Sequence, residues 1–484
     1  MKTCTKSIKE FTENISSQRT TAKLFIECCS LYKFCDNRLY KFDNKIKLWT
    51  ESIKEIFYSD YCDWIQATQL NYLNIFGKEM EQKDIKSFVD LITPKTTIKY
   101  ADAVYKYSLV EISDKEFLNK LNRCHPHLIP MKNNKCYDLQ TSKIIDRLQE
   151  HYFSYCFNVE YTDNKSNKVE KMINDICCGN IDEVLYLQKI LSYCFSGLNE
   201  GQLIFVFNGC GANGKSLILS LLDNIMGNFY AAVDKAIMIK DNKNSNISNA
   251  LYALTNKRVG FVSETNEGEQ LNEDIAKKIS GGDKLSCKKL YSNLGEFDTK
   301  LTIKLILCTN NLPQFNSTQH SLVRRIRLFK FNATFCDNPK KINEYKKDEG
   351  LLNDIIKNHL NEFFSWIVDG YKNIVNDISF EKDIPLSVKK SQDKYINEQN
   401  SFEGFFNDRL VLSDNKKDNI KRDMVYDNYL EYCKENEIVI RLKKKEILTM
   451  FNNKHKEAVK SDGLYIYRNI KWIWELDCKN DEKE

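Results

Sequence analysis

The sequence lacks any apolar run close to the roughly 18 residues that a helix needs to cross a membrane. Its opening residues, MKTCTKSIKEF, also lack the apolar centre of a secretion signal. Internal repeats and low-complexity linkers are absent too. Proline is scarce, with 6 in 484 residues, a bias that fits an AT-rich genome and does not bear on function. We therefore expect a soluble protein that works inside a cell.

No two cysteines have the C-x-x-C spacing of zinc ribbons, although the chain has 17 cysteines. Cys194 and Cys308 lie in apolar segments, as buried thiols commonly do. We therefore predict reduced cysteines in a reducing compartment. A zinc site built from scattered residues such as Cys28, Cys29 and Cys35 stays open as an alternative.

The chain also lacks a strong excess of charge of either sign. Lysine and arginine number 72 against 67 aspartates and glutamates, which gives a net charge of +5. A balance this mild does not indicate nucleic-acid binding by itself. With 42% hydrophobic and 12% aromatic residues the chain can build sizeable cores, and its length predicts two to four domains.

The first part of the chain is mainly helical in pattern. Segments 45–58 and 65–76 place apolar residues three and four positions apart. Segment 128–144 instead predicts a strand, a polar turn and a second strand. Residues 181–197 predict an amphipathic helix with its apolar residues mostly on one face, and Gly197 is a natural end for it.

From residue 202 onward, short apolar segments alternate with helical ones. The segments QLIFVFNG, RVGFVSE, LTIKLILCTN and RRIRLFKF each predict a buried strand. Strands that alternate with helices predict an α/β fold with a largely parallel sheet. We expect this sheet to extend to about residue 335.

The C-terminal part predicts two helices, at 421–436 and 443–455, followed by GLYIYRNIKWIWEL, which alternates like a β-hairpin at 463–476. Two helices and a hairpin are compatible with a winged helix. Residues 441–460 hold seven Lys or Arg against two Glu, which suits duplex DNA or, equally, a basic face on a protein-docking module. The expected parts are a mostly helical N-terminal domain at 1–175, an α/β domain at 176–345, a helical connector at 346–400 and a winged-helix-like domain at 401–484.

The segment LIFVFNGCGANGKSLILSLL contains the pattern G-x-x-x-x-G-K-[ST] between an apolar strand and a helix. Glycines let backbone N–H groups surround phosphates, and the helix N-terminus adds a positive dipole end. Lys215 can reach the β- and γ-phosphates of ATP, and Ser216 can place a hydroxyl on Mg²⁺. The residues expected to hold the nucleotide are Gly209, Gly211, Asn213, Gly214, Lys215 and Ser216.

Acidic residues follow the next predicted strand, in RVGFVSETNEGE. An acid at the end of a buried strand beside the phosphate loop can hold Mg²⁺ through water or orient the attacking water. Glu264 is our first choice for this role and Glu267 the second, with a solvated acidic loop as the alternative. The strand LTIKLILCTNN ends in Asn310, which can sense the γ-phosphate or simply cap the strand.

Basic residues occur in two further places. Arg324 and Arg325 precede the last predicted strand, where an arginine on a subunit edge can stabilise transition-state charge in a neighbour's site, although most surface arginines are only solvated. The segment IAKKISGGDKLSCKKLYSNLGEFDTK predicts a hairpin with Lys288, Lys289 and Tyr291 near its tip. Lysine beside an aromatic ring suits a grip on single-stranded nucleic acid, and a plain exposed hairpin is the alternative.

In their order along the chain, GCGANGKS, FVSETNEGE, KKISGGDKLSCKKLY, LILCTNNLP and VRRIRLF resemble the motifs of the superfamily 3 helicases. The sequence is most similar to the branch found in primase-helicases of poxviruses and giant DNA viruses. The resemblance is strongest at 205–331. The segment LIPMKNNKCYDLQTSKI and the C-terminal helices extend it over roughly residues 60–475.

This resemblance implies an ATP-dependent helicase for viral genome replication, built as a hexameric ring of AAA+ P-loop motors. Such rings hydrolyse ATP with Mg²⁺ at subunit interfaces and move 3′ to 5′ on single-stranded DNA. The resemblance implies that Lys215 and Ser216 bind nucleotide and magnesium, that Glu264 is the acidic Walker B residue and that Asn310 is the sensor.

The resemblance also implies contacts beyond the nucleotide. Arg324 or Arg325 would act in trans on a neighbouring subunit, and Lys288 or Lys289 would touch DNA in the central pore. The implied partners are single-stranded and forked DNA, further copies of the chain, and a separate primase or polymerase. The implied location is the host cytoplasm or a viral replication site, without membrane contact.

Two departures from the family pattern matter. Many members have two adjacent acids at the strand end, whereas here Ser263 precedes Glu264, so the division of roles between Glu264 and Glu267 is open. The large viral relatives also carry a primase domain, whose two-metal chemistry needs paired carboxylates, typically D-x-D. This sequence contains no D-x-D, so we expect no primase activity in this polypeptide.

Two other functions are compatible with the sequence. One is a P-loop ATPase that remodels or packages DNA or nucleoprotein without unwinding it. The other is a non-enzymatic replication-origin binder with a degenerate P-loop, against which the intact Gly-Lys-Ser argues. His125 and His127, on either side of Pro126, are interpreted as structural rather than as metal ligands.

Overall fold

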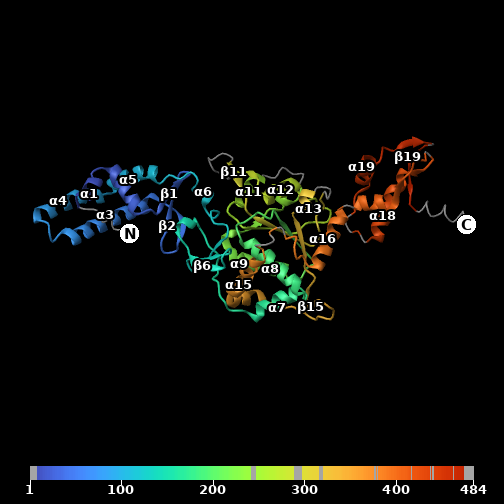
Figure 1. The fold of residues 1–484 in the computed structure, drawn as a ribbon, viewed down its shortest axis with the longest axis horizontal. Coiled ribbons are helices and arrows are strands. Elements are labelled where there is room, and N and C mark those ends of the chain that lie inside the picture. The colour runs from blue at the N-terminus through green and yellow to red at the C-terminus, as the bar shows by residue number, and fades with distance from the viewer. Residues whose placement is uncertain are drawn as a thin grey trace. The chain divides into compact units, whose positions relative to one another are not determined.

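The chain is described by a computed structural model, drawn in Figure 1. The described residues are 8–240, 247–287, 297–315, 320–374, 378, 380–399, 401–415, 417–436, 438, 441–461 and 463–473. The chain divides into two compact units, Met1–Tyr161 and Thr162–Glu484. Within these ranges, no helix has both the length and the apolar character that crossing a membrane demands.

The first unit packs its helices around an aromatic core. The ring of Phe25 meets those of Phe57, Tyr61 and Trp64 close to edge-on, with centroids 5.2, 5.6 and 5.3 Å away. Such ring pairs stabilise a core beyond the area they bury. The helix predicted at 65–76 is confirmed as part of α3. The helices are α1 (Ile8–Asn14), α2 (Gln18–Cys28), α3 (Lys54–Phe76), α4 (Gln82–Ile92), α5 (Ile98–Glu111) and α6 (Phe117–Lys120), with short 3₁₀ turns at Thr93–Thr96 and Gln149–His151.

Two small antiparallel sheets complete the first unit. Asp36 and Asn37 have φ of 49° and 58° and form the two-residue turn between β1 and β2, a conformation that Asp and Asn tolerate well. The interpretation of 45–58 as a helix is wrong before Lys54, because Trp49 lies on β3 and is buried against Phe42. The strand, turn and strand predicted at 128–144 are confirmed. The strands are β1 (Tyr32–Cys35), β2 (Arg38–Asp43), β3 (Leu48–Ser52), β4 (Leu128–Pro130), β5 (Lys135–Asp138) and β6 (Lys143–Asp146).

A five-stranded parallel sheet forms the centre of the second unit, with the order β13-β7-β12-β9-β8. The four predicted strands and their parallel arrangement are confirmed. The edge strand β8 was not predicted, because YAAV is short and mostly not fully buried. The strands are β7 (Ile204–Asn208), β8 (Tyr230–Val233), β9 (Val259–Val262), β12 (Lys304–Thr309) and β13 (Ile326–Lys330).

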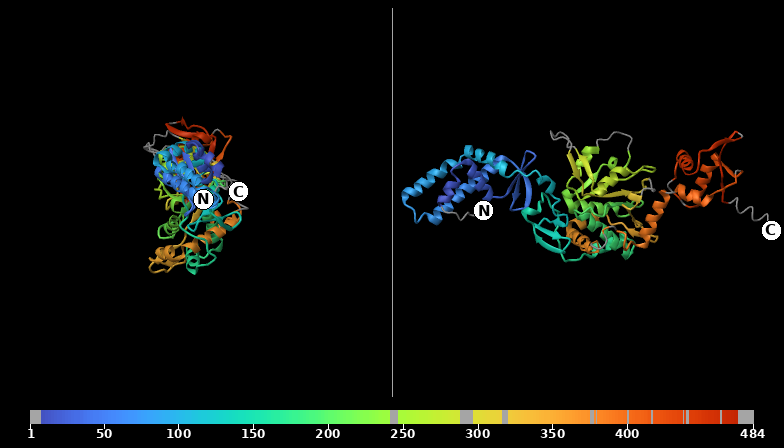
Figure 2. Two further views of the ribbon diagram at one scale, coloured as in Figure 1. Left: turned by 90° about the vertical axis from the view of Figure 1, so that its left-hand side faces the viewer. Right: turned by 45° about the horizontal axis from the view of Figure 1, so that its top comes forward.

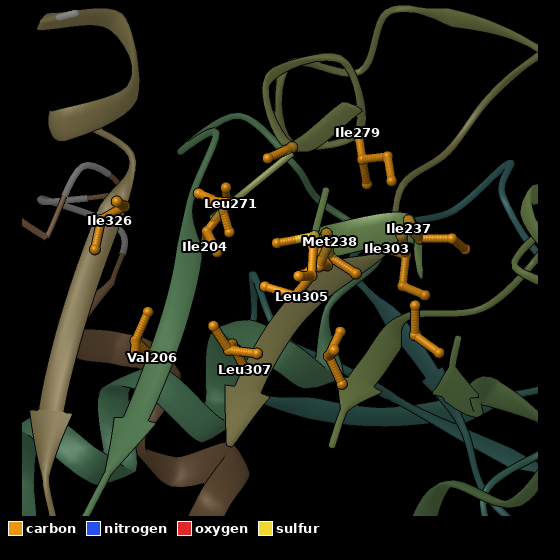
Figure 3. Close-up of a cluster of buried hydrophobic side chains, with 14 of the residues drawn as sticks. Ile204, Val206, Ile237, Met238, Leu271, Ile279, Ile303, Leu305, Leu307 and Ile326 are labelled. Atoms are coloured by element: carbon orange, nitrogen blue, oxygen red, sulfur yellow. The ribbon is translucent and has the colours of Figure 1, made fainter. Parts of the chain in front are cut away.

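The two faces of this sheet pack differently, because successive side chains of a strand point to opposite faces. Ile204 and Leu305 belong to an aliphatic cluster on one face, shown in Figure 3. Phe205 lies on the other face, with its ring 6.2 Å from Tyr193 and 5.7 Å from Phe380. Figures 1 and 2 show α11 (Ile247–Ala253) and α12 (Glu273–Gly281) on one side of the sheet, and α8 (Ile181–Phe195) and α15 (Leu360–Asp369) on the other. Both faces are therefore covered, as a parallel sheet requires.

Helix α8 (Ile181–Phe195) confirms the helix predicted at 181–197, and it ends just before Gly197. The prediction that its apolar residues lie mostly on one buried face is wrong, because every residue from Tyr186 to Phe195 is buried. The helix packs against α15 and the 3₁₀ turn Gly370–Asn373 as well as against the sheet. The other helices around the sheet are α7 (Asn167–Ile176), α9 (Lys215–Met226), α10 (Lys235–Met238), α11 (Ile247–Ala253), α12 (Glu273–Gly281) and α13 (His320–Val323), with a 3₁₀ turn at Gly227–Phe229.

After β13 the second unit consists of helices and small sheets of two or three strands. The two helices predicted at 421–436 and 443–455 are confirmed as α18 and α19. The hairpin predicted at 463–476 is wrong: β19 pairs with β18 and β17, whereas β20 pairs with β16. Gly463, with φ of 83°, provides the turn between β18 and β19, so the hairpin lies one strand earlier. Trp474 lies outside the described residues.

The bounds of these elements are as follows. The first strands and helices are β14 (Thr334–Cys336), β15 (Glu344–Lys346), α14 (Leu351–Asp354), a π-helical turn at Ile355–His359, α15 (Leu360–Asp369) and α16 (Leu386–Gln399). The C-terminal ones are α17 (Ser401–Arg409), β16 (Leu410–Leu412), β17 (Asn419–Lys421), α18 (Arg422–Glu435), α19 (Lys444–Lys454), β18 (Val459–Ser461), β19 (Leu464–Arg468) and β20 (Ile470–Trp472).

Two buried basic side chains join the sheet to the C-terminal end of α8. Arg258, just before β9, donates from Nη1 to the carbonyl of Phe195 at 2.7 Å. Lys304, which begins β12, donates to the carbonyls of Ser196 and Leu198. The last carbonyls of a helix have no partner inside the helix, so these N–H donors satisfy the carbonyls of Phe195 and Ser196 and one just beyond the helix. Burial lowers the pKa of Lys304 to about 7.

We expect the free energy of unfolding of the wild type, relative to that of Lys304→Met, to rise between pH 7.5 and pH 9. In this window the unfolded lysine, with its ordinary pKa of 10.5, keeps its proton while the folded lysine has lost it, so stability increases with pH. The rise should be on the order of 1 to 2 kcal/mol. Urea unfolding of both proteins at the two pH values measures it. A difference that does not change with pH would show that the buried amine stays charged.

Candidate nucleotide-binding site

The phosphate-loop pattern forms a tight turn between β7 and α9, as predicted. Gly214 has φ of 91°, and a Cβ there would lie 2.8 Å from Cγ1 of Ile176. A Cβ at Gly209 would lie 2.5 Å from the carbonyl oxygen of Phe331. Both positions therefore require glycine. Gly211 differs, because a Cβ there would meet nothing within 4 Å, so packing does not require glycine at this position.

Hydrogen bonds hold the loop in place. The side-chain amide of Asn213 donates to the carbonyl of Cys210 at 3.1 Å, and its Oδ1 accepts from the backbone N–H of Lys215 at 3.4 Å. The N–H of Phe335, in β14, donates to the carbonyl of Ala212 at 2.7 Å. The loop is therefore braced by Asn213 from within and by the segment after the sheet from outside.

The ammonium of Lys215 connects the loop to the end of β12. It donates to the carbonyl of Gly209, to Oδ1 of Asn213 at 3.2 Å and to Oδ1 of Asn310 at 3.2 Å. A lysine has three N–H donors, so these acceptors match its capacity. Burial lowers the pKa of Lys215. The predicted lysine and the predicted sensor are therefore in direct contact.

A cavity of about 770 Å³ lies against the loop. Lys215, Ser216, Glu264 and Asn310 all line it, so residues from α9 and from beyond the ends of β9 and β12 meet at one place. A hydroxyl and a carboxylate are the oxygen ligands that Mg²⁺ accepts, with phosphate oxygens and water completing its shell. In the part of the chain that the structure describes, no group of three or more His, Cys, Asp or Glu could hold a metal ion alone.

The structure separates the two candidate acids. Glu264 lines the cavity, whereas Glu267 is exposed in the following turn and is not among the described residues of the cavity wall. The sequence placed Glu264 on a strand beside the phosphate loop. In the sheet, β12 lies between β7 and β9, so Glu264 reaches the loop across the end of the sensor strand.

The apolar part of the cavity wall has no recognisable motif in the sequence and was not predicted. Met172 on α7, Phe335 on β14, and Leu351 and Leu352 on α14 line the cavity, and they belong to segments without a recognisable motif. Helix α7 precedes the expected start of the α/β domain, and α14 follows its expected end. The apolar spacing of 167–176 is typical of a helix and carries no signal of a ligand.

Arg324 and Arg325 lie just before β13, at the edge of the sheet. Both donate to Oε1 of Gln202 at 2.9 Å. Arg325 is 8% exposed and also donates to the carbonyl of Ser321. Arg324 is exposed. Of the two, Arg324 is therefore the one that presents its guanidinium to solvent.

The paired stem of the predicted basic hairpin is present. Strand β10 (Lys284–Cys287) pairs antiparallel with β11 (Phe297–Lys300), and Lys284 lies opposite Lys300. The predicted DNA contacts Lys288, Lys289 and Tyr291 lie outside the described residues.

The cysteines among the described residues are free thiols, and Cys29 and Cys35 are buried in the first unit. No metal-ligating group includes them or Cys28 within the described ranges. His125 and His127 lie with their rings 6.0 Å apart, and Nε2 of His125 is 3.2 Å from the carbonyl of Glu150. These contacts are those of residues that hold a loop in place.

Gly214, which is half-buried, and Gly211, which is exposed, give a matched test. We expect Gly214→Ala to weaken binding of a fluorescent ATP analogue at least tenfold, because the new methyl group needs a left-handed backbone and collides with Ile176. Gly211→Ala should change binding by less than about threefold, because its methyl group enters open space. Equal losses in both variants would contradict this description of the loop.

No protein-family model matches the chain. Among solved structures, the apo C-terminal region of NrS-1 aligns with a TM-score of 0.44 and 12% identity, covering 93% of this chain and 98% of that one.

Sequence comparison aligns the chain with proteins of large DNA viruses. The candidate helicase L207/L206 of Acanthamoeba polyphaga mimivirus is 26% identical over 467 residues, which cover 89% of this chain and 47% of that protein. The candidate primase C962R of African swine fever virus is 24% identical over 359 residues, 71% of this chain and 36% of that protein. Primase D5 of fowlpox virus is 30% identical over 196 residues, 38% of this chain and 24% of that protein. The chain spans about half the length, or less, of these relatives. It is a distant homologue of the helicases and primase-helicases of giant viruses and poxviruses, the group that its motifs resemble.

Proposed function

We propose that the chain is the motor of an ATP-dependent DNA helicase that works as a ring in viral genome replication. One observation carries the proposal: the cavity at the carboxyl end of the sheet is lined by Lys215, Ser216, Glu264 and Asn310 together. The chemistry of this set is that of nucleotide hydrolysis, and the viral relatives supply the expectation that DNA is the track.

Each residue of the set has a role in this proposal. Lys215 neutralises the β- and γ-phosphates of ATP, beside the backbone N–H groups of the loop. Ser216 and Glu264 would hold Mg²⁺, which neutralises charge on the phosphate oxygens when bound. Glu264 orients the attacking water, and Asn310 contacts the γ-phosphate or that water. Glu267, outside the cavity wall, is not needed for these steps.

The apolar wall of the cavity provides a place for the nucleoside. Met172, Phe335 and Leu351 offer a surface on which a flat base can lie, next to the loop that takes the phosphates. An apolar wall holds a base by burial and stacking. In this proposal α7 and the segment 334–352 belong to the motor.

The proposed assembly is a ring of identical AAA+ subunits, a hexamer in the family that the motifs resemble. Arg324 then acts as the finger, because it is exposed at the edge of the sheet, whereas Arg325 is buried and held by Ser321 and Gln202. A guanidinium supplied by a neighbour stabilises the charge of phosphoryl transfer in the transition state.

The proposed track is single-stranded DNA at a fork. The paired stem of β10 and β11 would carry Lys288, Lys289 and Tyr291 toward the strand, for phosphate contact and stacking. Movement 3′ to 5′ follows the family. Since the chain lacks D-x-D, primer synthesis would fall to a separate primase, with a polymerase as a further partner.

We expect the wild type to separate a forked duplex in the presence of ATP and Mg²⁺, and Lys215→Ala to separate none. Loss of the lysine removes a charged contact to the phosphates, so hydrolysis should fall by about 100-fold or more. The exposed Lys372 gives a matched control, and Lys372→Ala should behave as the wild type. Hydrolysis without strand separation would favour the remodelling or packaging ATPase. A wild type that neither binds nor hydrolyses ATP would refute the motor.

We expect Arg324→Ala to bind ATP normally and to hydrolyse it about a thousandfold more slowly, because only the trans contribution is lost. Mixing Arg324→Ala subunits with Lys215→Ala subunits should restore part of the hydrolysis. In mixed rings an intact site of the first variant meets an intact arginine of the second. Turnover that stays at the level of the separate variants would contradict action in trans, and the same recovery with Arg325→Ala in place of Arg324→Ala would move the assignment to Arg325.

A further inference from the structure

The acid strand and the sensor strand separate just before the cavity. Strands β9 and β12 pair in parallel from Val259 opposite Lys304 up to Val262 opposite Leu307, and the pairing stops there. Glu264 and Asn310, which line the cavity, lie beyond the last pair. Something other than the backbone ladder must therefore set the separation of these two side chains.

Two buried threonines form hydrogen bonds to each other beyond the last backbone pair of β9 and β12. Thr309 is 0% exposed and Thr265 is 2% exposed, and their hydroxyl oxygens are 2.6 Å apart. The N–H of Thr265 also donates to the Thr309 hydroxyl at 3.4 Å. These bonds cross from one strand to the other directly beside Glu264.

The donors and acceptors around the two hydroxyls determine the direction of their hydrogen bonds. A hydroxyl has one proton to donate and two lone pairs to accept with. The Thr309 oxygen accepts from the N–H groups of Asn311 and Thr265, so its proton is directed to the Thr265 hydroxyl or the Asn311 carbonyl, each 2.6 Å away. The Thr265 hydroxyl donates to the same carbonyl of Asn311. The residues on both sides of Asn310 are thereby fixed.

The phosphate-loop strand holds the sensor from its other side. Asn208, the last residue of β7, donates from Nδ2 to the carbonyls of Thr309 and Asn310, at 3.2 Å each. The backbone of Asn310 is therefore held by Asn208 and Thr309 together, while its side chain is directed to the ammonium of Lys215. Hydrogen bonds therefore connect the loop, the sensor and Thr265, the residue after Glu264, in one partly buried network.

We propose that Thr309 is a positioning residue for ATP hydrolysis, which through Thr265 and Asn311 sets the separation of Glu264 and Asn310 at the γ-phosphate end of the cavity. This inference rests on the proposed function. Water attack on a phosphate depends on sub-ångström placement of the groups around it, so loss of the network should act on the chemical step. Nucleotide binding depends on the loop and Lys215, whose contacts do not pass through the threonine hydroxyls.

Thr309→Val tests the role of the hydroxyl, because valine has the shape of threonine but can neither donate nor accept. We expect kcat for ATP to fall about 10- to 100-fold, with KM and the bound nucleotide per subunit changed by less than about threefold. Thr309→Ser, which restores the hydroxyl, should recover most of kcat. Glu264→Gln is the reference for a site that binds nucleotide without turnover.

Thr21→Val is the matched control. Thr21 is a 0% exposed threonine of the first unit whose hydroxyl donates to the carbonyl of Ser17, so Thr21→Val removes a buried hydroxyl that is not part of the second unit. It should leave kcat unchanged. The inference is overturned if Thr309→Val keeps the kcat of the wild type, if it loses nucleotide binding in proportion to kcat, or if Thr309→Ser fails to restore turnover. Absence of turnover in the wild type would instead refute the proposed function.

Discussion

The parallel pairing of β7, β12 and β9 is the constraint on which the rest of the second unit depends. Parallel strands all end at the same edge of a sheet, so the chain that leaves each strand emerges beside the others. The phosphate loop, Asn310 and Glu264 follow these three strands in turn. They are far apart in sequence and share one cavity for this reason alone. An antiparallel arrangement of the same segments would have placed Glu264 or Asn310 at the opposite edge.

This arrangement buries polar side chains at both ends of the strands β9 and β12. Arg258 and Lys304 occupy the amino ends of β9 and β12, where they satisfy carbonyls at the end of α8. At the carboxyl ends of the same strands, Thr265 and Thr309 form hydrogen bonds through their hydroxyls instead of through basic side chains. The nitrogens of Arg258 and Lys304 act as donors to a helix end that offers several carbonyls, whereas hydroxyls can both donate and accept between two strands. The amino and carboxyl ends of β9 and β12 are therefore both held by side-chain hydrogen bonds.

The sequence allowed the strands and the loop to be predicted because their signals are local. An apolar run with a glycine-rich turn after it, or a polar residue at its end, needs no knowledge of distant segments. The order of strands in the sheet is a different matter, since nothing in RVGFVSE indicates that β12 separates it from β7. The cavity wall was missed for a related reason: Met172 and Phe335 have no motif, and only the packing of α7 and β14 on the loop brings them there. The strand at 48–52 was missed because its apolar spacing is that of a helix, whereas in the structure it pairs with β2 across the turn at 44–47, in which Lys47 has φ of 54°.

Lys215 shows how the site could couple binding to position. Its ammonium has three protons, and the acceptors that it contacts are oxygens of the protein: the carbonyl of Gly209, Oδ1 of Asn213 and Oδ1 of Asn310. A phosphate that takes up this ammonium must replace at least one of these partners, because no further N–H is available. Asn213 and Gly209 belong to the loop itself, whereas Asn310 belongs to the sensor strand. Exchange of the Asn310 contact for a phosphate oxygen would release the sensor amide toward the nucleotide, while Asn208 and Thr309 keep its backbone in place. Arrival of the phosphate and orientation of the sensor would then become one event, which is what the proposed ATP-driven motor requires.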